Sequence, residues 1–431
     1  MKYHLIFSLL FFSFFVKAQE VITSDIDNFW DAYDQIKQNK DTNQHAKILK
    51  ELFFDKGTQG LRLIMERRQY TPEEYLFAIR QYPKFWNSIR KNTFNSKTLA
   101  LELKKGIQKL KRLYPDLKPA NIYFTIGVFR TNGTISENNI LIGSELAMAE
   151  ETTITEEFPE SLQHLKTYFL TNPIKSVVLL NIHEFVHTQQ KSMRQTLLYQ
   201  CFYEGVAEFI SVKAMGKPSS TPAVHFGKKN YLKVRDRFEQ EMFMNNKTNL
   251  WLWSSQKNEF NMRDLGYYIG YDIAERYYEE AKDKKKAIKI LIELDYSNTT
   301  SVNNLINSTK FFSNSLDSLA QAFEKRRPKV IKVTPFENQA KNVAFGRIQL
   351  TIYFSEPMDS NFRGFDYGPL GESNVLTIQR VIGFSEDKKS IMVEVDLQAN
   401  KQYQLLITER FQNSEGIPLK PYLIDITTIS K

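Results

Sequence analysis

The chain of 431 residues contains one cysteine, Cys201. Exported proteins often rely on disulfides, but a single cysteine cannot form one within the chain, so stability must come from packing and from any bound metal. We interpret Cys201 itself as a small core residue.

Long apolar runs are also scarce. One run, Leu5 to Val16, follows the basic Lys2 and precedes the small Ala18. About a dozen apolar residues are too few to cross a bilayer of about 30 Å as a helix, so residues 1–18 are predicted to be a secretory signal peptide. No cysteine for a lipid anchor follows the expected cleavage point, and no other run reaches about 18 apolar residues. We therefore expect an exported protein without a transmembrane anchor, located in the periplasm, at the cell surface or outside the cell.

The excess of basic residues is modest, and these residues are not clustered in one segment. The formal charge of +9 falls to +7 when Lys2 and Lys17 leave with the signal peptide, and the remaining lysines are dispersed. We find no nucleic-acid motif, internal repeat or low-complexity tract, so no nucleic-acid partner is expected. Apolar residues at 42% and charged residues at 25% are typical of a folded protein, whose length allows two or three domains.

The periodicity of apolar residues changes along the chain. From Ser24 to Tyr114 it is helical, whereas Asn121 to Leu146 is rich in β-branched residues around Asn132-Gly133, which predicts a β-hairpin with its turn there. A buried helix should follow, with Asn172 as N-cap and Pro173 in its first turn. The next helix is predicted from about Thr196 to Met215, where Gly216 stops it.

Further helical segments follow up to Arg327, and the period then switches to two. Ile348, Leu350, Ile352 and Phe354 share one face of a predicted strand. The fold class is therefore predicted to be multi-domain: a mainly α-helical (α+β) domain over residues 19–327, with the hairpin upstream of its central helix, followed by an all-β sandwich over 328–431.

Two of the six histidines stand four residues apart in the segment "NIHEFVHTQQ". On a helix His183 and His187 lie about 40° apart and can present two imidazole nitrogens to one ion, with Glu184 beside them. A catalytic zinc needs three protein ligands and an open position for water, which an adjacent carboxylate can deprotonate. This pattern predicts a zinc site with Glu184 as general base.

The third ligand is expected from "YEGVAEF" on the next helix, which offers Glu204 and Glu208 one turn apart. We assign Glu204 to the metal and Glu208 to the free N–H of a ligand histidine, because such partners fix the orientation of the imidazole. The opposite order remains open. We find no convincing fourth ligand.

Three other interpretations compete with catalysis. His183 and His187 can be a buried pair in an ordinary helix, or hold a metal without catalysis. The chain can also be a catalytically silent surface or motility-associated binding protein. Glu184 discriminates, because a structural zinc site is closed by four protein ligands and needs no free carboxylate.

Several segments together resemble a known family. "HEFVH" followed by "EGVAEF" is similar to the gluzincin clan of zinc metallopeptidases, in which two helices supply His, His and Glu. With "DIDNFWDAYD", "GTISENNILIGSEL" and "LGYYIGYDIAERYY", the chain from about residue 24 to 325 resembles predicted Zn-dependent proteases related to gliding-motility lipoproteins of Bacteroidetes. The resemblance implies His183, His187 and Glu204 as ligands and Glu184 as base. Sixteen residues separate His187 from Glu204, somewhat fewer than in better-studied gluzincins, so Glu208 stays open as a ligand.

The resemblance implies a peptide or protein substrate, and an endopeptidase is preferred. In gluzincins an edge strand beside the active-site helix binds the substrate backbone, a role we assign to "NNILIGSEL", with Glu145 meeting a substrate amine. Tyr267 and Tyr271 are candidate donors to the oxyanion, with packing in the core as the favoured alternative. His225 is an alternative donor.

The C-terminal domain resembles bacterial Ig-like modules of the SbsA type through "VIKVTPFENQAKNVAFGRIQLTIYFSEPMD". Such modules usually space or present a catalytic domain, so contact with the cell surface is a candidate role for it.

Overall fold

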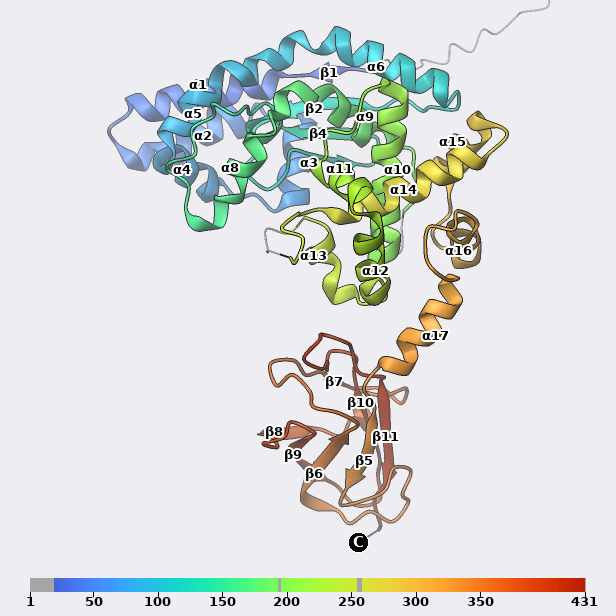
Figure 1. Cartoon of the computed structure of the whole chain (residues 1–431). Helices are drawn as coiled ribbons and strands as arrows, with labels where there is room; N and C mark the ends of the chain where they lie inside the picture. The colour runs from blue at the N-terminus through green and yellow to red at the C-terminus, as the bar shows by residue number, and fades with distance from the viewer. Residues whose placement is uncertain (1–18, 193–194, 254–257, 431) are drawn as a thin grey trace, which may run out of the picture. The chain divides into compact units, whose positions relative to one another are not determined.

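The computed structural model describes residues 19–192, 195–253 and 258–430 (Figure 1). Over these residues the protein is a multi-domain α+β protein of two compact units. Among the described residues, the first comprises 19–192, 201–229 and 258–309, and the second 195–200, 230–253 and 310–430. The predicted signal peptide lies outside the described residues, and the predicted boundary at 327/328 stays a prediction. Within the described ranges, no helix combines the length and apolarity that crossing a membrane requires.

Helices dominate the first unit, as the helical spacing of its apolar residues predicts. Between Ser24 and Tyr114 they are α1 (Ser24–Gln38), α2 (His45–Leu49), α3 (Gln59–Arg68), α4 (Pro72–Gln81), α5 (Pro83–Phe94) and α6 (Ala100–Leu113). Later helices are α7 (Ser144–Ala147), α8 (His164–Phe169), α9 (Val177–His187), α10 (Leu197–Met215, in this unit from Cys201), α11 (Pro222–Lys229), α14 (Leu265–Glu280), α15 (Lys284–Glu293) and α16 (Thr299–Ser308).

The first unit contains one mixed sheet, which packs against α9. Its order is β1 (Val21–Ile22), β2 (Asn121–Thr125), β4 (Asn139–Gly143) and β3 (Gly133–Ser136). β2 is parallel to β1 and β4, whereas β3 and β4 form an antiparallel hairpin. The predicted turn at Asn132-Gly133 is wrong, because Gly133 already pairs with Ile142. The hairpin instead turns at Glu137, which has a positive φ of 53°.

β4 is an inner strand and all of its residues are buried. The expectation that "NNILIGSEL" forms the edge strand is therefore wrong. β3 is the edge strand that α9 contacts. A strand that is apolar on both faces belongs inside a sheet, which the unbroken run Ile140 to Ile142 satisfies.

The start of α9 also differs from the prediction. Asn172 has a left-handed conformation with φ 54° and makes no side-chain cap, and Pro173 begins a 3-10 turn that precedes the helix. The Asn172 Oδ1 atom accepts a hydrogen bond from the Glu151 backbone N–H instead. The prediction of a central, buried helix is confirmed, because nine of its eleven residues are buried.

The second unit contains two antiparallel sheets. One is β5 (Val330–Thr334), β6 (Gly346–Phe354), β9 (Ser390–Leu397) and β8 (Ile378–Phe384), and the other is β11 (Tyr422–Thr427), β10 (Gln402–Ile407) and β7 (Phe365–Asp366). Leu350 and Ile352 of β6 share one hydrophobic core with Leu405 of β10 and Ile424 of β11, which makes a β-sandwich. The helices of this unit are α12 (Tyr231–Glu241), α13 (Thr248–Trp251) and α17 (Leu316–Arg326). The resemblance to bacterial Ig-like modules stays a prediction.

Candidate metal centre

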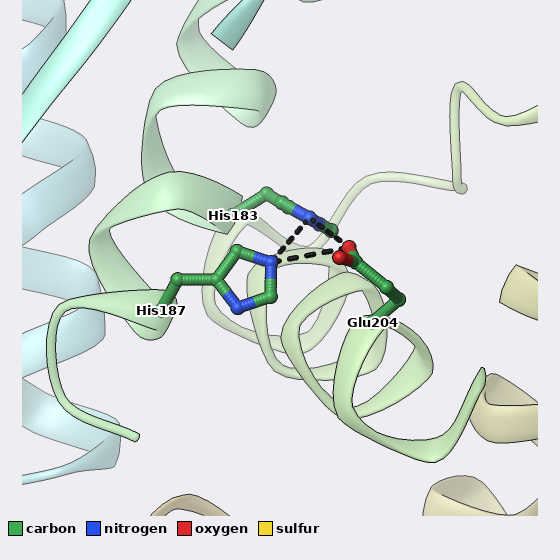
Figure 2. Close-up of side chains that lie close together, drawn as sticks. All are labelled: His183, His187 and Glu204. Atoms are coloured by element: carbon green, nitrogen blue, oxygen red, sulfur yellow. Dashed lines mark hydrogen bonds and ion pairs between the residues drawn. The ribbon is translucent and has the colours of Figure 1, made fainter. Parts of the chain in front are cut away.

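Three side chains from α9 and α10 converge on one point (Figure 2). The Nε2 atoms of His183 and His187 are 3.1 Å apart. Oε2 of Glu204 lies 3.5 Å from Nε2 of His183 and 3.2 Å from Nε2 of His187. This group of donor atoms can hold a metal ion.

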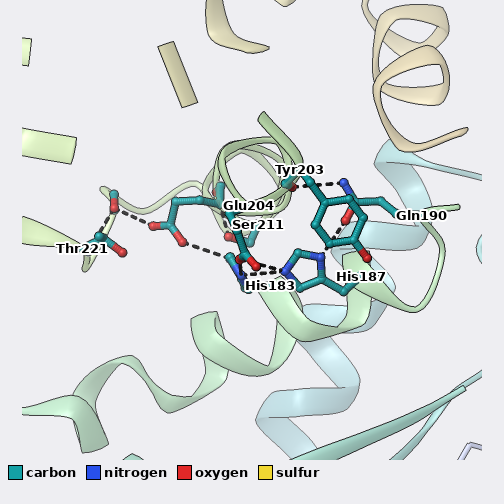
Figure 3. Close-up of polar contacts among 9 residues, drawn as sticks. His183, His187, Gln190, Tyr203, Glu204, Ser211 and Thr221 are labelled. Carbon is teal, nitrogen blue, oxygen red and sulfur yellow. Dashed lines mark hydrogen bonds and ion pairs between the residues drawn. The ribbon is translucent and has the colours of Figure 1, made fainter. Parts of the chain in front are cut away.

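The second nitrogen of each imidazole has its own acceptor. Nδ1 of His183 lies 3.2 Å from Oε2 of Glu208, and Nδ1 of His187 lies 2.7 Å from Oε1 of Gln190 (Figure 3). An acceptor at each Nδ1 atom favours the Nδ1–H form of the ring, and when the rings are neutral this form turns both Nε2 lone pairs toward Glu204. Three acceptor atoms then face one another, an arrangement that a cation between them stabilises.

The two glutamates of α10 have different places. Glu204 lies at the Nε2 side of both histidines, whereas Glu208 lies behind His183 and accepts a second hydrogen bond from Ser219. The Ser219 hydroxyl in turn accepts from the Thr221 backbone N–H at 3.0 Å. Glu204 thus belongs to the group that could hold a metal ion, whereas Glu208 contacts the opposite nitrogen of His183.

The charges of the centre are strongly coupled. Burial alone lowers the pKa of His183, but hydrogen bonds to Glu204 and Glu208 raise it to about 10. Burial alone raises the pKa of Glu204, and both histidines together hold it well below its usual range. The carboxylates therefore make this buried position attractive to positive charge.

Glu184 is buried directly beside the ligands, 7% exposed. Burial raises the pKa of its carboxyl group, and the two histidines oppose that effect. Its carboxylate also borders the edge strand, because a Cβ atom added to Gly133 would lie 2.8 Å from Glu184 Oε1. Glu184 thus lies between the metal ligands and β3.

A close helix crossing positions Glu204. A Cβ atom at Gly205 would lie 2.1 Å from the carbonyl carbon of Gly270, and one at Gly270 would lie 2.0 Å from the backbone oxygen of Cys201. The backbones of α10 and α14 therefore touch, which glycine allows because it has no Cβ atom. The buried Cys201 belongs to this crossing, which fits its interpretation as a core residue.

The two candidate tyrosines of α14 lie in different surroundings. The Tyr267 ring centroid is 6.1 Å from that of His183 and the side chain is partly exposed, so Tyr267 borders the centre. Tyr271 instead packs edge-on against Phe209 at 5.5 Å and lies under the Lys228 ammonium. Of these two tyrosines, Tyr267 is the one brought beside a candidate metal ligand.

Glu145 and His225 have partners within the chain. Glu145 is fully buried at the start of α7, and its carboxylate oxygens accept hydrogen bonds from the backbone N–H groups of Gly127 and Phe129. This placement does not support its predicted contact with a substrate amine. His225 is exposed on α11 and its Nε2 lies 2.8 Å from the Ser219 backbone oxygen, behind Glu208 rather than among the ligand atoms.

The structure adds residues that the sequence interpretation missed. Gln190 bridges the ligand helices, because its Oε1 accepts from His187 while its Nε2 donates to the Tyr203 carbonyl at 3.2 Å. The Tyr203 ring stacks on the His187 imidazole, with centroids 4.6 Å apart and planes at 13°. Gln190 lies three residues beyond the end of α9 at His187, so helical periodicity alone does not assign it this role.

No family model and no curated protein matches the chain. Among solved structures, the S-layer protein rSbsC(31-844) matches with a TM-score of 0.18 and 14% identity over 66% of this chain and 44% of that one. The N-terminal part of the bacterial S-layer protein SbsC matches with a TM-score of 0.19 and 11% identity over 94% and 71% of the two chains. The chain spans less than half the length of the first of these structures. TM-scores this low carry no argument about fold or function.

Proposed function

We propose that this protein is an exported zinc-dependent metallopeptidase. The observation that carries the proposal is the convergence of two imidazole nitrogens and the Glu204 carboxylate beside a further buried carboxylate, Glu184. Among the described residues, three side chains form the metal-binding group, which matches the ligand number of catalytic rather than closed structural zinc sites.

The donor atoms fit zinc in kind and in spacing. Imidazole nitrogen and carboxylate oxygen are both good zinc ligands, at distances of about 2.0–2.2 Å. Two ligands about 2.1 Å from a tetrahedral ion lie about 3.4 Å apart. The separations of 3.1, 3.2 and 3.5 Å between the atoms of His183, His187 and Glu204 are close to this value.

Bound zinc supplies a Lewis acid that lowers the pKa of water to about 7. The side chains supply the rest of the chemistry. Glu184 accepts a proton from the attacking water and then donates it to the nitrogen of the leaving amine, so its position between the ligands and the substrate strand is essential. Glu208 and Gln190 hold the two imidazoles in the orientation that leaves Nε2 unprotonated.

In this proposal the substrate peptide binds along the edge strand β3. Asn132 accepts a backbone hydrogen bond from Gly143, so the alternate residues Gly133 and Ile135 turn their backbone groups away from β4. The Gly133 and Ile135 carbonyls accept hydrogen bonds from Thr131 and Arg67 in this structure. An extended peptide that displaces these two donors and pairs with this edge would lie next to Glu184. Tyr267, on the other side of His183, is the candidate donor of a hydrogen bond to the developing oxyanion.

The test combines metal analysis with peptide hydrolysis. The purified mature chain should contain one zinc per molecule and cleave members of a peptide mixture. Glu184→Gln should retain zinc and lose hydrolysis, whereas His183→Ala should lose zinc. A protein without stoichiometric zinc contradicts the proposal. Zinc binding with equal peptide degradation by wild type and Glu184→Gln favours the surface-binding interpretation instead.

A further inference from the structure

Two neighbouring arginines at the end of α3 lie along the edge strand β3. Arg67 Nε donates to the Ile135 carbonyl at 3.3 Å, and Ile135 is one of the residues whose backbone groups face away from β4. Arg68 Nη2 donates to the Thr131 hydroxyl at 3.2 Å. The guanidinium groups thus mark the two ends of β3.

The Arg68 end leads directly to the general base. The Thr131 hydroxyl that accepts from Arg68 also donates to the Gly133 carbonyl, and the Gly133 Cα atom borders the Glu184 carboxylate. These contacts connect the Arg68 guanidinium, through Thr131 and Gly133, to the carboxylate of the proposed base.

Neither guanidinium forms an ion pair in the part of the chain that the structure describes. The Nε atom of Arg68 is buried and has no hydrogen-bond partner there. A planar guanidinium with spare donors recognises a carboxylate. An edge strand with such a group at each end suits a peptide that carries negative charge.

We propose that Arg67 and Arg68 select peptides with acidic side chains on either side of the cleaved bond. This inference rests on the proposed peptidase function and adds the substrate class. Charge-assisted hydrogen bonds to a carboxylate should favour an acidic peptide over its amide counterpart about tenfold or more in kcat/KM.

The test uses zinc-loaded full-length mature protein and peptide pairs that differ only by Glu or Gln beside the cleaved bond. The wild type should prefer the Glu peptide, and the ratio should fall toward one in the Arg67→Gln, Arg68→Gln double variant. Arg62→Gln is the matched control, because Arg62 lies on the same helix but donates to the Gly57 carbonyl. Its ratio should equal that of the wild type.

Equal cleavage of Glu and Gln peptides by the wild type, or a preference that survives in the double variant, overturns the inference. Binding of the same peptides to the zinc-loaded Glu184→Gln protein separates this failure from failure of the peptidase proposal. If no peptide is cleaved, the peptidase proposal fails, while the ratio of the two dissociation constants still tests the arginines. No binding, or binding without charge discrimination, overturns their role.

Discussion

Gly133 of the edge strand leaves no room for a side chain next to Glu184. A Cβ atom at Gly133 would lie 2.8 Å from Oε1 and 3.1 Å from Cγ of that glutamate. The Glu184 carboxylate therefore packs directly against the backbone of β3. This close approach between the proposed base and β3 depends on the absence of a Cβ atom at Gly133.

The first prediction follows from this contact. Gly133→Ala should push the Glu184 carboxylate out of place and lower kcat/KM by about a hundredfold, because small misplacements of catalytic groups are costly. Zinc content should stay the same, since the ligands come from α9 and α10. Ser136→Ala, at the other end of β3, is the control and should leave peptide hydrolysis close to wild type. Unchanged hydrolysis by Gly133→Ala would show that the Glu184 carboxylate tolerates the displacement.

The second prediction concerns the orientation of His187. Gln190→Ala removes the acceptor 2.7 Å from Nδ1 and should weaken zinc binding about 10–100-fold, as measured by competition with a chelator. Gln190→Glu keeps an acceptor and should restore much of the affinity. Gln189→Ala is the matched control, because Gln189 bonds to the Lys118 backbone instead. Equal affinity of the Gln190→Ala and Gln189→Ala proteins would refute the orienting role.

The third prediction concerns pH. Burial raises the pKa of Glu145 from 4.5 to about 7, against the opposing hydrogen bonds from Gly127 and Phe129. Between these values the folded state keeps a proton that the unfolded chain has released, so the free energy of unfolding contributed by Glu145 falls as pH rises. The loss is on the order of 3 kcal/mol across this window.

Glu145→Gln has no carboxyl group to titrate and should remove this loss. Urea unfolding at about pH 5 and about pH 8 should show the variant gaining stability relative to wild type at the higher pH. Glu151→Gln replaces an exposed neighbour and should follow the wild-type pH dependence. Parallel curves for wild type and Glu145→Gln would contradict the effect of burial.

The sequence predicts which side chains come together at the centre better than it predicts the strands around them. A spacing of four residues on a helix is a geometric constraint, so the positions of His183 with His187, and of Glu204 with Glu208, follow from local structure alone. Burial on both faces of α9 likewise follows from its apolar composition. The helices and the alternating burial in β6 are also predicted correctly, because the spacing of apolar residues is a local signal.

The features that the sequence did not predict depend on contacts between segments that are distant in the chain. Asn132-Gly133 is a good turn signal, but pairing of β2 with β4 moves the turn to Glu137 and leaves β3 at the edge. The sequence suggests that Glu145 can contact a substrate, but its carboxylate accepts hydrogen bonds from the backbone N–H groups of Gly127 and Phe129. Gln190 and Gly133 acquire their roles only when separate elements meet.

The last prediction tests the helix crossing behind Glu204. A methyl group at Gly270 would lie 2.0 Å from the Cys201 backbone oxygen, where no flexible side chain can yield. Gly270→Ala should therefore force α10 and α14 apart and cost about 1–3 kcal/mol or more of stability, seen as a lower thermal midpoint. Because Cys201 and Glu204 share α10, zinc affinity should fall as well. Glu280→Ala, at the exposed end of α14, is the control. If Gly270→Ala matches that control in both measurements, the contact between the two backbones does not position Glu204.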